Sequence, residues 1–285
     1  MAGFGSKSFS LSIAEWAGIA SFLTALLLLF LDARLSVIPL AGFLLLCAVA
    51  PFFPRFSFYV PTITRGKSGK KAVALTFDDG PDPKTTPELL RLLQKHGVTA
   101  TFFVTGKKTS KHPELVKKIL LQGHSIGNHT YAHDHLVFLR SSKLLMKEIE
   151  STQNTVGEFG ITPLAFRSPA GITSPRLPQV LKKLNLYNVA YSCRAIDGGN
   201  RWIGKLSKRI LKRIRPDDII LLHDITPKKD RLFRYWLNEI ELILLGIEEK
   251  GLAVLPLSVL IGRPVMITKA TPCSSPAVSD LTSIA

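Results

Sequence analysis

The stretch of residues 72–104, AVALTFDDGPDPKTTPELLRLLQKHGVTATFFV, decides the fold. It begins with a short apolar segment, Ala72–Phe77, which is typical of a buried strand. A helix follows, and Thr85 or Thr86 is suited to cap its first turn. The β-branched and aromatic segment Thr99–Val104 then predicts a second strand. Two strands joined through a helix form the unit from which parallel sheets are built.

The same alternation continues along the chain and predicts a parallel sheet covered by helices. No glycine-rich phosphate loop follows the first strand. We therefore expect an α/β fold with a closed or partly open (β/α) barrel of about seven parallel strands, rather than a flat nucleotide-binding sheet. The remaining strands are expected at residues 124–127, 163–166, 187–192, 218–222 and 252–257, with helices at 113–122, 142–159, 175–184, 203–215 and 231–249.

Two apolar stretches, Ile13–Leu31 and Leu35–Phe53, precede this domain and are separated only by residues 32–34. Each has 19 residues, close to the roughly 20 that a helix needs to cross a bilayer. We therefore expect residues 1–54 to form an integral membrane segment, a transmembrane helical hairpin. One alternative is a cleaved signal peptide, which Pro51 argues against. Another is a single crossing with an interfacial or re-entrant second segment, which the prolines of that segment favour.

Basic residues flank both ends of this apolar segment, whereas the turn between its helices has one Arg and one Asp. The positive-inside rule then favours the cytoplasmic face for the domain that follows. Beyond the membrane segment we expect a basic linker at residues 55–70 and a globular domain at 71–262. The last residues, 263–285, are rich in Ser, Thr, Pro and Ala and predict a flexible tail.

The 285-residue chain is strongly basic, with 37 Lys and Arg against 21 Asp and Glu and a formal net charge of +16. This charge suits a solvated basic surface, an anionic membrane surface, or an acidic or lipid-phosphate substrate. No nucleic-acid-binding motif is present, so no nucleic acid is expected as a partner, and no obligate protein partner is inferred. The three cysteines include no C-x-x-C pair and indicate no disulfide framework.

Polar residues gather directly after predicted strands, at the edge where (β/α) barrels hold their active sites. Asp78 and Asp79 end the first strand and point in different directions, so one can bind a metal while the other faces a substrate. Alone, they would equally suit a turn that caps the next helix. His129 and His133 meet on one face if their segment makes a helical turn. Paired imidazoles of this kind bind zinc and similar metals, although such pairs also arise by chance.

Two more segments follow strands in the same way. Residues 167–171, RSPAG, offer an arginine and backbone N–H groups on a rigid turn, and His223 ends an apolar strand. Each has a plain structural explanation by itself, a loop or a buried histidine. Together with Asp78–Asp79 and the histidine pair they make a mononuclear hydrolase site. One carboxylate and two histidines would hold a metal, and the other carboxylate and histidine would be its base and acid.

These motifs, TFDDG, NHTYAH, RSPAG and LLHD, resemble those of the polysaccharide deacetylase family, also called the NodB-homology domain or carbohydrate esterase family 4. The resemblance covers Lys71 to Leu260. It implies a distorted (β/α) barrel that hydrolyses an N- or O-acyl group, usually the N-acetyl group of an amino sugar. The expected enzyme is thus a carbohydrate N-deacetylase, a hydrolase of carbon–nitrogen bonds other than peptide bonds.

The resemblance also implies roles for individual residues. Asp79, His129 and His133 would bind one divalent metal ion, with Zn²⁺ expected and Co²⁺ or Ni²⁺ as alternatives. Asp78 would be the general base and His223 the general acid. The supporting residues would be Arg167, which orients Asp78; Asp197, which modulates His223 or Arg167; Ala170, whose backbone N–H binds the oxyanion; and Leu221, which lines the pocket for the acyl methyl group.

Two positions depart from the family pattern. Ala170 stands where a bulkier residue such as Tyr is common, and Gly198 follows Asp197 where a Trp is usual. Both changes predict a more open cleft. They weaken the expectation of the usual polymer substrate and leave the expected hydrolysis chemistry in place. The main hypothesis is N-deacetylation of an amino-sugar polysaccharide. The alternatives are a deacylase of a lipid-linked amino sugar or glycolipid at the membrane, and a non-catalytic membrane-bound glycan-binding protein.

Overall fold

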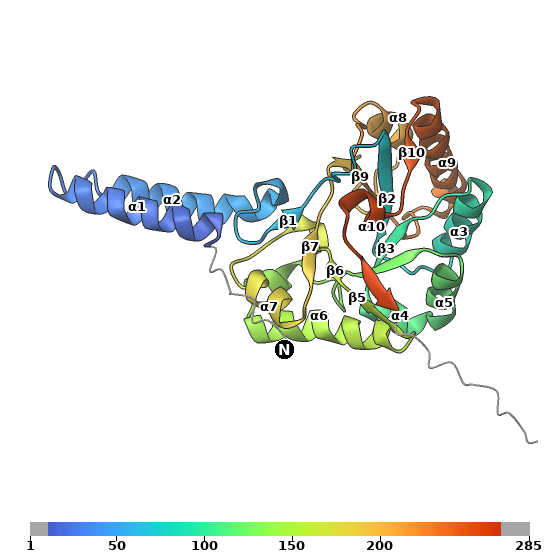
Figure 1. Cartoon of the computed structure of the whole chain (residues 1–285), viewed down its shortest axis with the longest axis horizontal. Coiled ribbons are helices and arrows are strands. Elements are labelled where there is room, and N and C mark those ends of the chain that lie inside the picture. The colour runs from blue at the N-terminus through green and yellow to red at the C-terminus, as the bar shows by residue number, and fades with distance from the viewer. Residues whose placement is uncertain (1–10, 269–285) are drawn as a thin grey trace, which may run out of the picture.

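The centre of the molecule is a curled parallel sheet built around strand β2 (Ala72–Asp78) (Figure 1). The computed structural model describes residues 11–268. Among them, nine strands form one sheet that remains open between its two end strands. The predicted parallel, partly open barrel is confirmed, although with more strands than expected. In sheet order the strands are β1 (Thr62–Ile63), β7 (Tyr187–Val189), β6 (Ala165–Phe166), β4 (Ser125–Asn128), β3 (Thr101–Val104), β2, β9 (Ile219–His223) and β8 (Cys193–Arg194), and β10 (Ala253–Val254) also pairs with β2.

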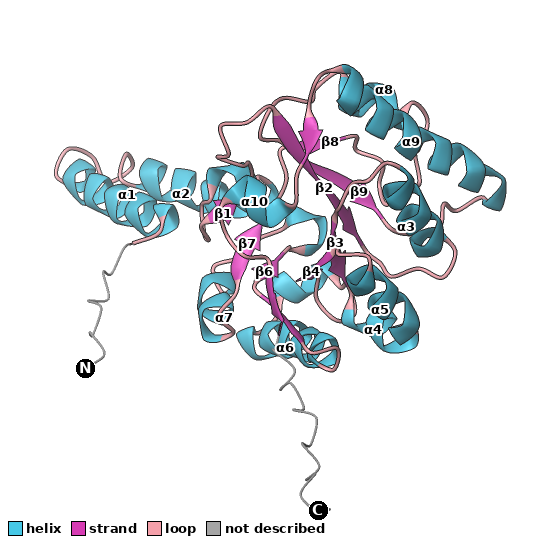
Figure 2. Cartoon of the chain, turned by 45° about the vertical axis from the view of Figure 1, so that its right-hand side comes forward, coloured by secondary structure: helices cyan, strands magenta, loops and turns pink. Residues whose placement is uncertain are grey.

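Helices surround this sheet, as Figure 2 shows. The predicted helical segments are present, and the structure adds two short helices that periodicity did not reveal, α4 and α10. Six residues or fewer leave too little sequence for a 3.6-residue repeat to be recognised. The helices of the domain are α3 (Thr85–Lys95), α4 (Gly106–Lys111), α5 (Pro113–Leu121), α6 (Ser142–Gly157), α7 (Leu177–Lys183), α8 (Leu206–Leu211), α9 (Phe233–Glu249) and α10 (Leu257–Ile261).

The two faces of β2 contact different parts of the domain. Val73, Leu75 and Phe77 point outward and belong to the large apolar core shared with the covering helices. The alternate positions carry small or polar residues, and the last two of these, Thr76 and Asp78, are buried and meet the Arg167 side chain. Because successive side chains of a strand point to opposite faces, one short segment builds both the core and the interior of the barrel.

Residues 62–68, part of the expected linker, are tied to the domain. Strand β1 pairs with β7, the Gly66 N–H donates to the Asp217 carbonyl over 2.8 Å, and the Lys67 N–H donates to Leu260 over 3.1 Å. The expected tail also begins later than residue 263. Strand β11 (Met266–Thr268) pairs antiparallel with β5 (Ile161–Pro163), because the unpaired edge of β5 offers it backbone partners. The rest of the expected tail, 269–285, lies outside the described residues.

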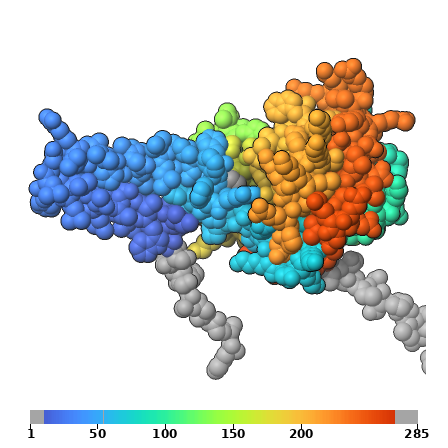
Figure 3. All heavy atoms as spheres, turned by 90° about the horizontal axis from the view of Figure 1, so that it is seen from above, coloured from blue at the N-terminus to red at the C-terminus, as the bar shows by residue number. Residues whose placement is uncertain are grey.

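The two apolar stretches at the start of the chain form a helical hairpin that projects from the barrel (Figures 1 and 3). The helices are shorter than the stretches. α1 (Ile13–Leu29) has 17 residues and α2 (Val37–Val49) has 13, which at ~1.5 Å per residue gives about 26 Å and 20 Å. The prediction of two membrane-crossing helices is therefore wrong for the described residues, none of whose helices is long and apolar enough to cross a bilayer. The turn between them takes up apolar residues from both stretches, and the 3₁₀ segments Ala50–Phe52 and Pro54–Phe56 take up the end of the second.

Candidate active site

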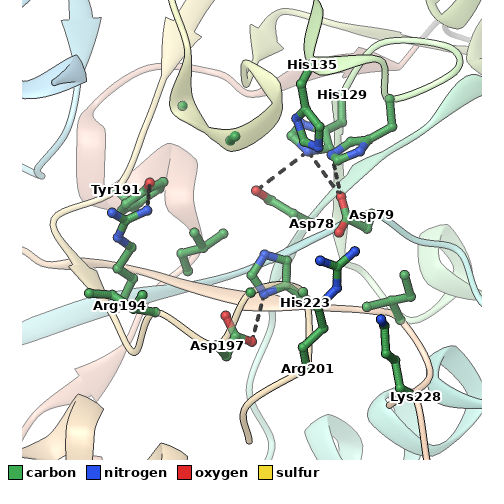
Figure 4. Close-up of a pocket in the computed structure, with 18 of the residues that line it drawn as sticks. Asp78, Asp79, His129, His135, Tyr191, Arg194, Asp197, Arg201, His223 and Lys228 are labelled. Carbon is green, nitrogen blue, oxygen red and sulfur yellow. Dashed lines mark hydrogen bonds and ion pairs between the residues drawn. The ribbon is translucent and has the colours of Figure 1, made fainter. Parts of the chain in front are cut away.

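The carboxyl ends of four parallel strands meet at one pocket of about 500 Å³ (Figure 4). β2 ends in Asp78, β4 leads to His129, β6 leads to Arg167 and β9 ends in His223. Eight of the nine predicted site residues line this pocket, and the ninth, Arg167, lies beneath it. The lining members are Asp78, Asp79, His129, His133, Ala170, Asp197, Leu221 and His223.

Asp79, His129 and His133 form a candidate metal site. Their ligating atoms all lie within 4.8 Å of one another. The Asp79 Oδ1 atom is 2.9 Å from His133 Nε2 and 3.4 Å from His129 Nε2. An ion about 2.0–2.2 Å from each donor would place neighbouring donors roughly 3 to 3.5 Å apart. The geometry therefore fits one divalent ion.

The orientation of His129 supports the same assignment. Its Nδ1 lies 2.7 Å from the Arg167 carbonyl oxygen and donates a proton to it. Nε2 then faces Asp79, and in the neutral ring its lone pair is available to a metal. Metal-binding histidines typically donate their second ring N–H to a carbonyl or carboxylate in this way.

The ionised state of the Asp79 carboxylate also suits a metal ligand. Burial alone would raise its pKa, but hydrogen bonds and charge interactions with His129 and His133 outweigh burial and hold the pKa well below its usual value. The carboxylate is thus ionised over the physiological range.

The two histidines do not meet through a helical turn, as their spacing had suggested. Residues 129–133 form a loop in which Thr130 and His133 have φ of 63° and 59°. Asp79 itself has φ of 73°. Non-glycine residues in this region cost of order 1–3 kcal/mol each, and they persist where surrounding contacts hold them. Two of the three candidate ligands therefore have a strained backbone.

Glu148 of helix α6 supplies the contacts that hold this loop. Its Oε2 accepts hydrogen bonds from the backbone N–H groups of Tyr131, at 3.1 Å, and Ala132, at 2.8 Å. Sequence reasoning missed Glu148 because nothing in a helical segment marks one glutamate as the partner of a distant loop.

Arg167 is buried and organises Asp78. Its Nη1 donates to Asp78 Oδ1 and to Thr76 Oγ1, both at 2.7 Å. The other guanidinium nitrogens donate to the carbonyls of Val189 and Ala190, and the group stacks over the Phe103 ring at 3.9 Å. With Oδ1 occupied, Asp78 Oδ2 is turned toward the candidate metal site, 3.9 Å from His129 Nε2.

His223 and Asp197 form the second charged pair of the pocket. His223 Nδ1 donates to Asp197 Oδ2 over 2.9 Å. Burial lowers the pKa of His223, but the hydrogen bond to Asp197 and the charges of Asp197, Asp79 and Asp78 outweigh burial and raise the pKa to about 9. The imidazole therefore carries a proton at neutral pH. Its Nε2 remains free to present that proton to the pocket.

Asn200, which sequence reasoning also missed, fastens the loop that carries Asp197. Its side-chain amide donates to the carbonyls of His223, at 3.1 Å, and Ile225, at 2.6 Å. Its backbone N–H donates to Asp197 Oδ2 over 3.3 Å. The loop and the end of β9 are thus held as one unit.

The third-motif loop places Ala170 at the pocket wall with φ of 54°. Leu221 is buried and lines the pocket from β9. Trp202 packs against Gly198, where an added Cβ would lie 2.8 Å from its ring. A tryptophan thus reaches the Asp197–Gly198 segment from four residues further along the chain, although its side chain is 63% exposed and does not line the pocket.

His135, which is not among the predicted site residues, lines the pocket as well. Its ring packs edge-on against His133 with centroids 4.7 Å apart. Burial lowers its pKa, and so does the charge of His133. The neutral ring is therefore a wall of the pocket beside a candidate ligand.

The sequence of this chain is similar to those of known proteins. A family model described as Polysaccharide deacetylase matches residues 65–189. The chain is 35% identical over 167 residues to the peptidoglycan-N-acetylglucosamine deacetylase of Listeria monocytogenes, a match that covers 58% of this chain and spans only about a third (35%) of that protein. It is 34% identical over 172 residues to the chitooligosaccharide deacetylase of Sinorhizobium fredii, covering 59% of this chain and 79% of that one.

The fold also has counterparts among solved structures. The crystal structure of the Bc1960 peptidoglycan N-acetylglucosamine deacetylase superposes with a TM-score of 0.65 and 29% sequence identity. The match covers 72% of this chain and 94% of that one. The similarity therefore extends over nearly the whole of the (β/α) domain of this chain.

Proposed function

This chain belongs to the polysaccharide deacetylase family, and from that premise we propose that it is a metal-dependent carbohydrate N-deacetylase. It would hydrolyse the amide bond of an N-acetyl group on an amino sugar of a polysaccharide. The observation that carries the proposal is one pocket that joins the Asp79–His129–His133 cluster to the Asp78–Arg167 and His223–Asp197 pairs.

Asp79, His129 and His133 would hold the metal, for which Zn²⁺ is the first candidate because it favours imidazole and carboxylate donors. A bound divalent ion would polarise the amide carbonyl and lower the pKa of a neighbouring water. The other steps fall to side chains of this protein.

Asp78 is the proposed general base. Arg167 fixes Oδ1 of Asp78, so that Oδ2 is the atom free to take a proton from the attacking water. As the water oxygen bonds to the acyl carbon, negative charge moves onto the carbonyl oxygen. The backbone N–H of Ala170, at the pocket wall, is the proposed donor to that oxygen.

His223 is the proposed general acid. It carries its proton at neutral pH, and Asp197 holds the opposite ring nitrogen so that Nε2 faces the pocket. Transfer of this proton to the amide nitrogen lets the carbon–nitrogen bond break and releases the free amine and acetate. Leu221 supplies the apolar wall that suits an acyl methyl group.

The proposed substrates are N-acetylglucosamine polymers of the peptidoglycan or chitin type, since these are the substrates named for the relatives. The test is release of acetate from N-acetyl chitooligosaccharides and from peptidoglycan fragments by the full chain loaded with Zn²⁺, Co²⁺ or Ni²⁺. We expect release that a chelator abolishes and that Asp78→Asn lowers by at least about 100-fold. Sugar binding without acetate release by any metal-loaded form would instead support a glycan-binding protein.

We also propose that the α1–α2 hairpin attaches the protein to a membrane. Its surface exposes many large apolar side chains, among them Phe30 and Leu31, which are 83% and 78% exposed. Contiguous apolar surface of this extent marks a site of interaction. The basic residues on either side of the hairpin suit the anionic surface of the cytoplasmic leaflet.

A further inference from the structure

The catalytic pocket has a cationic rim made of Arg194, Arg201 and Lys228, which the proposed deacetylation does not use. All three side chains are exposed residues that line the pocket. In the view of Figure 4, Arg194 lies on one side of His223, and Arg201 and Lys228 lie on the other. The rim therefore flanks the position of the leaving amine.

The acidic residues of the pocket do not neutralise this rim. Asp78 is paired with Arg167 and Asp197 with the protonated His223, and the charge of Asp79 would be met by the metal that it holds with His129 and His133. Within residues 11–268, none of the three rim side chains forms an ion pair. A divalent ion would add further positive charge.

The Arg194 side chain is held by a hydrogen bond at the pocket wall. Its Nη1 donates to the hydroxyl of Tyr191 over 2.6 Å, which directs the guanidinium along the pocket wall. A guanidinium placed in this way retains N–H groups that suit a phosphate or carboxylate. A neutral N-acetyl polymer offers no partner for such a group.

The base of the apolar hairpin adjoins the same pocket. The Thr173 N–H donates to the Pro51 carbonyl over 3.2 Å, two residues beyond the pocket-lining Gly171. Arg55 Nη2 donates to the Ser192 carbonyl over 2.5 Å, next to the pocket-lining Tyr191. The cationic rim and an apolar surface are thus available to one substrate.

We propose that this cationic rim binds a phosphoryl group on the amino-sugar substrate, either through Arg194 on one side of His223 or through Arg201 and Lys228 on the other. The substrate class is an N-acetyl amino sugar with a phosphate ester, and the inference rests on the proposed function. The phosphate can belong to a soluble sugar phosphate or to a lipid-linked sugar phosphate. The adjoining hairpin favours the lipid-linked form.

The experiment compares kcat/KM of the full, metal-loaded chain on three probes. They are neutral N-acetyl chitotetraose, N-acetylglucosamine 1-phosphate, and polyprenyl-phosphate-linked N-acetylglucosamine in phosphatidylcholine vesicles. We expect the phosphorylated probes to exceed the neutral one at least tenfold. Added salt should raise KM for the phosphorylated probes only, because it screens exposed charges.

Single substitutions Arg194→Gln, Arg201→Gln and Lys228→Gln then locate the effect. Substitution on the side that binds the phosphoryl group should lower the ratio of phosphorylated to neutral kcat/KM about fivefold or more, mainly through KM, as expected for loss of a charge-assisted hydrogen bond. The matched controls Arg213→Gln and Lys250→Gln, which change exposed cations away from the pocket, should leave the ratio unchanged.

Two results would overturn the inference. They are a preference for the neutral probe and equal losses on all probes in the rim variants. Each of these requires measurable deacetylation. Failure of the proposed function would look different, since no probe would then be deacetylated.

Discussion

At the scale of single residues, adjacent side chains in the pocket have different roles because they contact different partners. Asp78 and Asp79 are adjacent in the chain, yet one meets a buried arginine and the other two histidines. The separation follows from the strand pleat, which turns Asp78 into the barrel, and from the left-handed conformation of Asp79 after the strand ends. His223 gains its proton-donating character in the same way, from Asp197 beside it.

Replacing Asp197 by Asn should change the pH dependence of catalysis. The hydrogen bond and the negative charge of Asp197 raise the pKa of His223, against burial, to about 9. A general acid must be protonated, so the rate should fall as pH rises through this pKa. In Asp197→Asn the pKa of His223 drops, the basic limb of the kcat/KM profile moves to lower pH, and the rate at pH 8 falls about tenfold or more. An unmoved basic limb would refute the pairing, and Glu249→Gln serves as the exposed control.

Asp224 should make stability depend on pH. Burial raises its pKa to about 7, although Thr85 and Thr86 both donate hydrogen bonds to it. An unfolded Asp ionises near pH 3.9. Between these two values the folded state holds the extra proton, so the free energy of unfolding falls as pH rises from about 4 to 7, by on the order of 4 kcal/mol. Below pH 4 the contribution is complete.

The variant Asp224→Asn cannot ionise and should remove this fall. Denaturant titrations of both proteins at pH 4.5 and pH 7.5 measure it, with the exposed Glu114→Gln as control. A parallel decline in wild type and Asp224→Asn would show that other groups cause the pH dependence.

At the scale of elements, loops rather than helices present the candidate metal ligands. The histidine loop is irregular, and helix α6 holds it through Glu148. The first-motif turn is held from its other side, because a Cβ on Gly80 would lie 2.3 Å from an oxygen of the buried Asp224. Packed helices and strands thus force strained turns into a fixed geometry.

Glu148→Ala should weaken metal binding. It leaves the N–H groups of Tyr131 and Ala132 without their acceptor, so the loop can relax and displace His133. Loss of a group that orients a metal ligand typically costs 10- to 100-fold in affinity, and we expect at least about tenfold here. Competition with a chromophoric chelator measures it. Glu150→Ala, on an exposed position of the same helix, is the control, and equal affinities in both variants would contradict the assignment.

At the scale of the whole molecule, the (β/α) domain and the apolar hairpin are distinct in surface character. The domain buries most of its apolar side chains between the sheet and the helices, whereas the hairpin leaves most of its own exposed. The hairpin base is joined to loops beside the pocket. Membrane attachment would therefore bring the pocket close to the lipid surface.

Changing the turn of the hairpin tests this attachment. In vesicle flotation with anionic lipids, Phe30→Ser/Leu31→Ser should bind at least about tenfold more weakly. The physical reason is that burying a large apolar side chain is worth about 1.5–3 kcal/mol. Leu121→Ser, which removes an 86% exposed leucine from the domain, should float like wild type. Unchanged flotation of the double variant would exclude the hairpin as the attachment.

Local sequence patterns determined much of the fold and of the candidate site. The alternation of strands and helices predicts the parallel barrel, and the motifs at strand ends predict the residues that line one pocket, because the carboxyl ends of parallel strands must share an edge. Apolar composition likewise located the hairpin. It overstated the lengths of the helices, because hydropathy does not show which residues at the ends of an apolar stretch form turns rather than helix.

Only the tertiary structure decided how these residues work together. The left-handed ligands, the contacts of Glu148, Asn200 and Asp224, and the rim of Arg194, Arg201 and Lys228 depend on segments far apart in the chain. A contact between two distant segments does not change the residue pattern of either segment, so the sequence pattern does not reveal it. The pKa values follow the same rule, because burial and neighbouring charge exist only once the chain has folded.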